Sequence, residues 1–228
     1  MSPRTFRGSR SLADQAAEHI RRHIVKGDYQ LGEALSETTL AAQLGVSKTP
    51  VREAFLRLET EGLVDIQPQR GTFVFRMGAA EVRALSEFRD VLESAALTLA
   101  MPMGASALGA ALGEIVSDME KALAGHDAAT YREHDSRFHE CIIRHSGNAY
   151  LVEAYDRIAF RVQTLRNKLS QEPALNQRSL GEHAELHRLI AAGDEADALA
   201  LLRRHIATTN SDYKATLGPE PGTAGQSS

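Results

Sequence analysis

The segment that most constrains the fold is residues 35–59, where two short helical patterns meet at Gly45. Ser36 can cap the first of these helices, whose expected buried face is Leu40 with Leu44. Glycine then permits the tight turn into the second helix. Two helices joined in this way are typical of a helix-turn-helix, in which the second helix enters the major groove of DNA.

The second helix opens with polar and basic residues. Ser47 or Thr49 can cap it, and Pro50 falls in its first turn, where a missing N–H costs little. The residues expected to face the core from this helix are Val51, Phe55 and Leu58, with Ala54 as an alternative to Phe55. Lys48 and Arg52 remain at the exposed N-terminal end, and arginine is the side chain best suited to bidentate contact with guanine. Any capped amphipathic helix leaves polar residues outside, so this helix alone does not establish a DNA contact.

A β-hairpin is predicted directly after that helix. Residues 63–67 and 72–75 have strand patterns, and residues 68–71 form the turn between them. Gly71 permits close backbone approach, and Arg70 at the tip can reach phosphates or the minor groove. Helix, turn, helix and hairpin in this order predict a winged helix. The residues expected to contact DNA are Ser47, Lys48, Thr49, Arg52, Arg57, Arg70 and Gly71.

The charge is divided unevenly along the chain. The net charge of −4 consists of +2 in residues 1–76, with 11 Lys and Arg against 9 Asp and Glu, and −6 in residues 77–228, with 15 against 21. Such asymmetry suggests different partners for the two parts. The basic excess is modest, so it supports the DNA-binding interpretation without establishing it.

The sequence predicts a mainly α protein of two domains. Residues 1–76 form the winged helix-turn-helix, residues 77–216 an all-helical antiparallel bundle, and residues 217–228 a Pro/Gly/Ser-rich tail expected to be disordered. In the first domain, Leu12, Ala16, Ile20 and Ile24 form one apolar helical stripe. In the second, six or seven helices are expected, at about 81–100, 105–125, 127–146, 148–170, 174–192 and 195–216, with Pro102 among the residues that separate them.

Some classes of protein are disfavoured by composition. No stretch approaches the roughly 20 apolar residues that a membrane span needs, and the basic N-terminus lacks the apolar core of a secretory signal. Cys141 is the single cysteine, so an intrachain disulfide is impossible. We therefore expect a cytoplasmic protein that does not act at a membrane.

Four polar residues of the bundle fall on apolar helix faces. Asp135 and His139 share a face with Phe138 and Ile142, at a spacing that lets two side chains hold one ion. His183 lies on the face of Leu186 and Ile190, and His205 borders that of Leu202 and Ile206. A buried carboxylate and imidazoles are costly unless they are paired or metal-bound. A hydrogen-bonded Asp–His network remains the alternative at this point.

Arg89 is the other unusual position. The helix around it has an expected inward stripe of Val82, Leu85, Leu92, Ala96 and Leu99. Arg89 falls inside this stripe, where Glu93 one turn later could neutralise it. Arg161 is a further candidate to face the interior, and the sequence does not decide its direction.

Residues 12–76 resemble the DNA-binding domain of the GntR family of bacterial transcription regulators. The matching pieces are Gly32-Glu33-x-Leu35-Ser36-Glu37, Leu40-Ala41, Leu44-Gly45-Val46-Ser47-x-Thr49-Pro50-Val51-Arg52-Glu53-Ala54, Leu58-x-x-Glu61-Gly62-Leu63-Val64 and Arg70-Gly71-Thr72-x-Val74. Leu31 stands where the family often has proline, and Lys48 where it often has arginine. The second departure puts in question which base or phosphate is contacted.

Residues 81–215 resemble the FCD effector domain of the FadR-like subgroup. In its metal-binding members an Asp-x-x-x-His pair and two later histidines hold the ion, which implies Asp135, His139, His183 and His205 as ligands. Imidazole suits zinc, nickel, iron or copper, and zinc, which accepts mixed N/O ligands, is the default expectation. The resemblance also implies that Arg89 grips a carboxylate of a small effector.

The resemblance implies a ligand-responsive transcription regulator, most often a repressor in this family. Such a protein is expected to act as a homodimer, because a twofold dimer reads the two half-sites of a pseudo-palindromic operator. Two alternatives stay open. The metal could be purely structural or be the sensed signal, or the site could belong to a metal-dependent enzyme. The second is disfavoured by the four protein ligands and by the lack of an evident acid–base residue.

Overall fold

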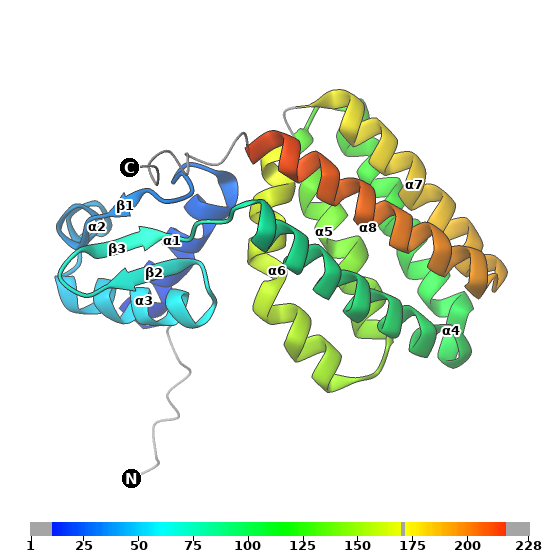
Figure 1. Ribbon diagram of the computed structural model, residues 1–228, viewed down its shortest axis with the longest axis horizontal. Coiled ribbons are helices and arrows are strands. Elements are labelled where there is room, and N and C mark those ends of the chain that lie inside the picture. The colour runs from blue at the N-terminus through cyan, green and yellow to red at the C-terminus, as the bar shows by residue number, and fades with distance from the viewer. Residues whose placement is uncertain (1–10, 170–171, 218–228) are drawn as a thin grey trace, which may run out of the picture. The chain divides into compact units, whose positions relative to one another are not determined.

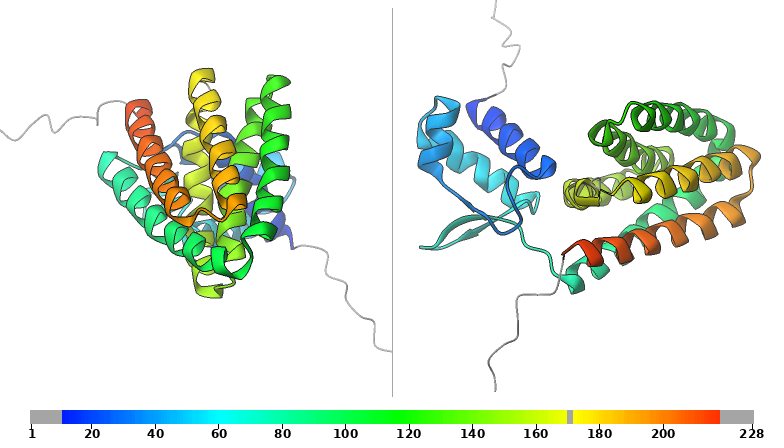
Figure 2. Two further views of the ribbon diagram at one scale, coloured as in Figure 1. Left: turned by 90° about the vertical axis from the view of Figure 1, so that its right-hand side faces the viewer. Right: turned by 90° about the horizontal axis from the view of Figure 1, so that it is seen from above.

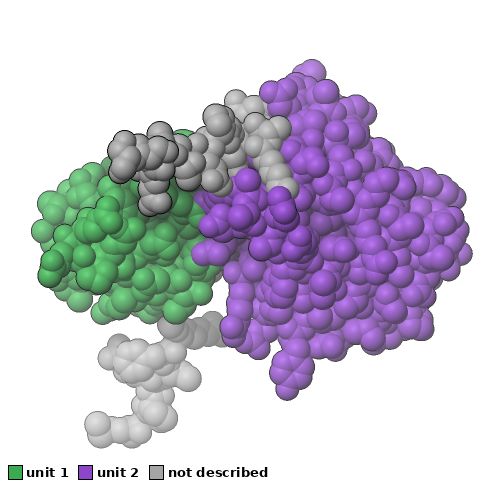
Figure 3. All heavy atoms as spheres, viewed as in Figure 1, with its two compact units in different colours: residues 1–76 green, residues 77–228 purple. Residues whose placement is uncertain are grey.

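The computed structural model describes residues 11–169 and 172–217 and divides the chain into two compact units, residues 1–76 and 77–228 (Figure 3). Within the described residues the first unit contains three helices and a small sheet, and the second consists of helices (Figure 1). This confirms the mainly α fold class with a small hairpin wing. The expected tail, 217–228, lies almost wholly outside the described residues.

The described part of the first unit has three helices: α1 (Leu12–Lys26), α2 (Glu37–Leu44) and α3 (Lys48–Thr60). The Ser36 side chain accepts a hydrogen bond from the Thr39 N–H at 3.3 Å, which caps α2 as predicted. Gly45 ends α2 with φ of 66°, a left-handed conformation that favours glycine, and so turns the chain into α3.

Three details of these helices differ from the sequence expectation. Leu12 is 56% exposed because it is the first residue of α1, and Ala13 is buried in its place. Leu44, the last residue of α2, is only half-buried. Ser47 stands at the N-cap of α3, but its side chain makes no capping hydrogen bond.

The sheet has three antiparallel strands in the order β1-β3-β2. They are β1 (Ala34–Leu35), β2 (Val64–Gln67) and β3 (Gly71–Val74). In the predicted hairpin Val64 lies opposite Val74, and Gln67 lies opposite Gly71 at the tip. The short strand β1, which the sequence pattern does not reveal, adds to the other edge of β3. The wing is therefore attached to the chain segment that leads into α2.

The second unit is an antiparallel bundle whose helices are visible from two sides in Figure 2. Its helices are α4 (Ala79–Ala124), α5 (Ala128–His145), α6 (Ala149–Leu169), α7 (Pro173–Ala192) and α8 (Glu195–Leu217). Leu97, Leu108, Phe138, Leu186 and Leu202 are among the fully buried side chains of one contiguous apolar core. This core surrounds the polar residues that the sequence singled out.

Helix α4 corrects two expectations. The break expected at Pro102 lies at Gly104, whose backbone is non-helical, and Pro102 stands inside the helix. Leu99 is 41% exposed, whereas Ala96 and Ala100 are buried. A helix has 3.6 residues per turn, so positions three and four residues after a buried residue both lie near its face. Here the buried face continues from Ala96 to Ala100, four residues later, and Leu99 lies at its exposed border.

An 18-residue window of α4, with a mean hydropathy of 1.5, is apolar enough to cross a membrane by length and composition alone. The expectation that no stretch approaches a membrane span is therefore wrong for α4 by length and composition. The core helix of a globular bundle passes the same test, and Leu92, Leu97, Leu108 and Leu112 of α4 are buried in the shared core. In the structure, 39% of that window is buried inside the bundle.

Gly109→Ala should destabilise the bundle by about 1–3 kcal/mol, because a Cβ at Gly109 would lie 2.9 Å from the Cα of Ala191 on α7. Gly181→Ala, in α7, meets nothing within 4 Å and should instead stabilise by roughly 0.5–1 kcal/mol through the lower entropy of its unfolded chain. Urea unfolding of both variants measures the difference. Equal effects of the two substitutions would show that close approach of α4 and α7 is not required.

Candidate metal centre and nucleic-acid interface

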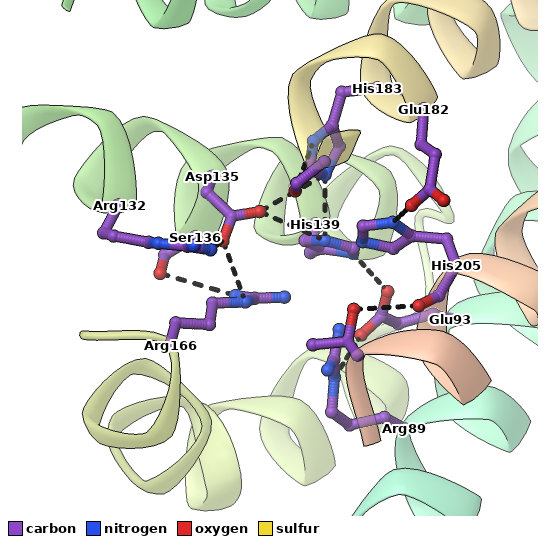
Figure 4. Close-up of polar contacts among 12 residues, drawn as sticks. Arg89, Glu93, Arg132, Asp135, Ser136, His139, Arg166, Glu182, His183 and His205 are labelled. Atoms are coloured by element: carbon purple, nitrogen blue, oxygen red, sulfur yellow. Dashed lines mark hydrogen bonds and ion pairs between the residues drawn. The ribbon is translucent and has the colours of Figure 1, made fainter. Parts of the chain in front are cut away.

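Asp135, His139, His183 and His205 come together at the centre of the bundle (Figure 4). Asp135 and His139 project from α5, His183 from α7 and His205 from α8, and all four residues are at most 2% exposed. One ligand atom from each lies within 4.8 Å of the others. Residues from three helices are thereby brought to one point.

The spacing of these atoms is compatible with one small divalent ion. His183 Nε2 lies 3.2 Å from Asp135 Oδ1 and 3.2 Å from His139 Nε2, and His139 Nε2 lies 3.7 Å from Asp135 Oδ1. Ligands at 2.0–2.2 Å from a tetrahedral zinc are about 3.3–3.6 Å apart. The three separations between Asp135, His139 and His183, at 3.2, 3.2 and 3.7 Å, lie within about 0.1 Å of this range.

Two of the imidazoles form a hydrogen bond to a carboxylate through Nδ1, the ring nitrogen that is not directed at the other ligands. His139 donates its Nδ1–H to Glu93 Oε2 at 2.5 Å, and His205 donates its Nδ1–H to Glu182 Oε2 at 2.6 Å. A carboxylate can only accept, so in each neutral ring the lone pair is left on Nε2. This carboxylate–histidine arrangement orients metal-binding imidazoles and raises their basicity.

Asp135 is held by two buried arginines. Arg166 Nε and Arg132 Nη1 each lie 3.3 Å from Asp135 Oδ2, which leaves Oδ1 directed at the imidazoles. Burial alone would raise the pKa of Asp135, but the charge of Arg166, together with that of Arg132, holds that pKa well below its usual range. The carboxylate is therefore ionised, as a metal ligand must be.

A second chain of contacts begins at Arg89. Its Nε donates to Glu93 Oε1 at 2.9 Å, so one carboxylate joins Arg89 to His139. Burial would raise the pKa of Glu93, but the charge of Arg89 and the hydrogen bond from His139 lower it far more. The neutralisation of Arg89 by Glu93 is thus present, yet it uses only Nε. The Nη1 and Nη2 atoms of Arg89 have no hydrogen-bond partner among the described residues.

The donor set fits a metal better than a closed hydrogen-bond network. In a network without metal, His183 Nε2 could donate a proton toward either Asp135 Oδ1 or His139 Nε2. In the described part of the chain, Asp135 Oδ1 is a buried acceptor with no hydrogen bond. A cation between these atoms satisfies all of them at once, because each supplies a lone pair.

Several residues of the site were not predicted from the sequence. Glu182 and Arg166 bind their partners from other helices, so no local spacing reveals them. Arg132 stands three residues before Asp135, a helical spacing that could have found it. Arg161, the candidate left open, is half-buried, while Arg166 is the α6 arginine that is 2% exposed.

All seven residues expected to contact DNA are exposed in the first unit. Ser47, Lys48, Thr49, Arg52 and Arg57 lie at or on α3, and Arg70 and Gly71 lie at the hairpin tip. The Arg52 Nε donates to both carboxylate oxygens of Glu37 on α2, at 2.9 and 2.8 Å. Arg57 forms an ion pair with Asp14 on α1. Arg57 thus faces α1, whereas Arg52 lies near the N-terminus of α3.

Known families match both units. The model described as bacterial regulatory proteins, gntR family, matches residues 12–74, and the FCD domain model matches residues 84–208. A Paenarthrobacter nicotinovorans protein named "Probable D-xylose utilization operon transcriptional repressor" is 30% identical over 201 residues, covering 86% of each chain. The chain belongs to the GntR family.

Further comparisons agree with this assignment. The gluconate operon transcriptional repressor of Bacillus subtilis is 26% identical to the GntR-family chain over 199 residues, 85% of this chain and 82% of the relative. The solved structure of E. coli McbR/YncC has a TM-score of 0.78 at 23% identity, covering 92% of this chain and all of the other, and shows the shared fold. The matched families are transcription regulators, so this GntR-family protein is a regulator and not an enzyme.

Proposed function

We propose that this GntR-family protein is a repressor that binds its operator as a homodimer in the cytoplasm and responds to a small organic acid through a metal-containing FCD domain. The observation that carries the proposal is the buried set of Asp135 Oδ1 and three imidazoles within 4.8 Å of one another. Repression is supported by the names of the Paenarthrobacter and Bacillus relatives. A dimer is supported by the one recognition helix found among the described residues, since two such helices are needed for a two-half-site operator.

The proposed ion is divalent, with Asp135, His139, His183 and His205 as ligands. Zinc is the first choice because it accepts this mixture of imidazole and carboxylate, and nickel, iron or copper are the other candidates. A bound ion supplies a Lewis-acid position that can take an oxygen of the effector. The unpaired Nη1 and Nη2 of Arg89 are the proposed partners of an effector carboxylate, which can accept both bonds of a planar guanidinium.

Regulation is proposed to occur by linkage between the two ligands. The acid favours one conformation of the dimer and DNA favours another, with a coupling of about 1–3 kcal/mol that must be reciprocal. Selection of operators from random-sequence DNA with the purified, metal-loaded chain is the first test, and we expect a pseudo-palindrome. The operator affinity is then measured with and without carboxylates. If no sequence is enriched, or if no acid changes the affinity, the corresponding half of the proposal is wrong.

Arg52→Ala should weaken binding to the selected operator by at least about 10–100-fold. A bidentate arginine–guanine pair contributes roughly 1–3 kcal/mol of discrimination, and a dimer loses one pair in each half-site. Binding to non-specific DNA should change much less. Fluorescence anisotropy at a fixed salt concentration measures both affinities. Arg188→Ala, an exposed arginine of the FCD domain paired with Glu185, is the matched control. An equal loss on specific and non-specific DNA would mean that Arg52 holds phosphate.

A purely structural metal is the second candidate role. Four protein ligands that are almost fully buried are the usual environment of a structural ion. The adjoining cavity has a volume of about 10 Å³, close to that of one water molecule. In this case metal removal would unfold the FCD domain, and acids would leave the operator affinity of the metal-loaded protein unchanged.

A further inference from the structure

The site in the FCD domain buries more positive than negative charge. Arg89, Arg132 and Arg166 are each at most 2% exposed. Among the described residues the buried carboxylates are Glu93 and Asp135, so these side chains have a net charge of +1. A buried cation without a counter-charge is costly, so this excess calls for an anion.

The other buried groups nearby do not supply one. Imidazoles that bind a metal are neutral, so His139, His183 and His205 leave the charge unchanged. Burial raises the pKa of Tyr155 to about 12 and also raises that of Tyr213, which keeps both phenols uncharged near neutral pH. A divalent ion then increases the buried charge to +3.

The rim of the site offers only partial compensation. Glu182 and Asp212 carry two negative charges there, and Arg178, which pairs with Asp212, carries one positive charge. The side chains of these three residues are 18–42% exposed, so water screens them. With this net −1 included, the metal-loaded site has an excess of about two positive charges.

Unpaired donors lie where this excess is concentrated. Arg89 Nη1 and Nη2, Arg132 Nε and Arg166 Nη2 have no hydrogen-bond partner among the described residues. Figure 4 shows the guanidinium groups of Arg89 and Arg166, which come from α4 and α6, pointing toward the same region beside His139. Two like charges that converge on one region are stabilised by an anion between them. Arg132 and Arg166 line the water-sized cavity, and Arg89 is not among its lining residues.

We propose that the effector carries at least two carboxylates, one held at the metal centre and one held by the guanidinium groups of Arg89 and Arg166. This inference rests on the proposed function and deepens it by naming the charge class of the acid. A monocarboxylate leaves an excess positive charge in the site, whereas a dicarboxylate neutralises it. The small cavity requires side chains at the rim, including the Arg178–Asp212 pair between α7 and α8, to move when the acid enters.

Isothermal titration of the full chain loaded with one equivalent of zinc tests the charge class. The probes are malonate, succinate and glutarate, each compared with its own monoamide, which has nearly the same size but one charge fewer. We expect at least one diacid to bind about 10–100-fold more tightly than its monoamide, because it gains charge-assisted hydrogen bonds to buried guanidinium groups. Metal content after each titration confirms that the acid has not removed the zinc.

Arg166→Gln and Arg89→Gln should each reduce this preference to within about threefold. Arg157→Gln, an exposed arginine on the same helix as Arg166, should leave it unchanged. If monoamides bind the wild-type protein as tightly as diacids and shift operator affinity equally, the charge class is wrong while the proposed function stands. If no acid of either kind binds the zinc-loaded protein, both the charge class and the effector role are overturned.

Discussion

His139→Ala should reduce zinc affinity by about 100–1000-fold. Binding of a structural zinc by four ligands is worth about 10–16 kcal/mol, so losing one ligand costs roughly 3–4 kcal/mol. The lost imidazole also leaves Glu93 without the N–H that it accepts at 2.5 Å. Competition with a chromophoric chelator measures the affinity. Plasma mass spectrometry of untagged protein, purified without chelator, should find about one metal per wild-type chain and little in the variant.

His134→Ala is the matched control for this experiment. It removes an imidazole from the same helix, but His134 lies outside the ligand cluster and contacts Arg137. Its zinc affinity should equal that of the wild type. If zinc added back to the wild-type protein binds no more tightly than to His139→Ala, the four residues form a hydrogen-bonded core without a metal.

Glu93→Ala should destabilise the metal-free protein by about 3–5 kcal/mol, a typical cost of breaking a buried ion pair. Glu93 accepts from both Arg89 Nε and His139 Nδ1, and its side chain is fully buried. Its removal leaves a buried guanidinium without its carboxylate partner. Urea unfolding gives the free energy of unfolding. Glu153→Ala, which breaks the exposed pair with Arg157, should change it by less than about 0.5 kcal/mol.

The pH dependence of stability distinguishes a charged Glu93 from a neutral one. Its folded pKa lies below the unfolded value of 4.5, so its contribution to stability is present above pH 4.5 and is lost as the pH falls further. Glu93→Gln, which cannot ionise, should therefore show a shallower loss of stability below pH 4.5 than the wild type. If the free energy of unfolding falls equally in the two proteins below pH 4.5, Glu93 is protonated in the native state.

The local elements of the first unit could be predicted because their signals lie close together in the chain. Ser36 caps α2, Gly45 adopts a left-handed turn, and the hairpin follows α3 directly. Strand β1 could not be predicted, because two residues become a strand only through pairing with β3, nearly 40 positions away. Leu99 was wrongly expected on the buried face of α4, because a small error in the assumed angle per residue adds up along a long helix.

Residue types and helical spacing were enough to identify Asp135, His139, His183, His205 and Arg89 as polar groups on apolar faces. What folding adds is the set of partners from other helices: Glu93 behind His139, Glu182 behind His205 and Arg166 beside Asp135. Helical periodicity tells which way a side chain faces within its own helix. It contains no information on which helices pack together, and burial energies across the bundle decide that. The tautomers of the imidazoles and the excess charge of the site therefore follow from tertiary packing.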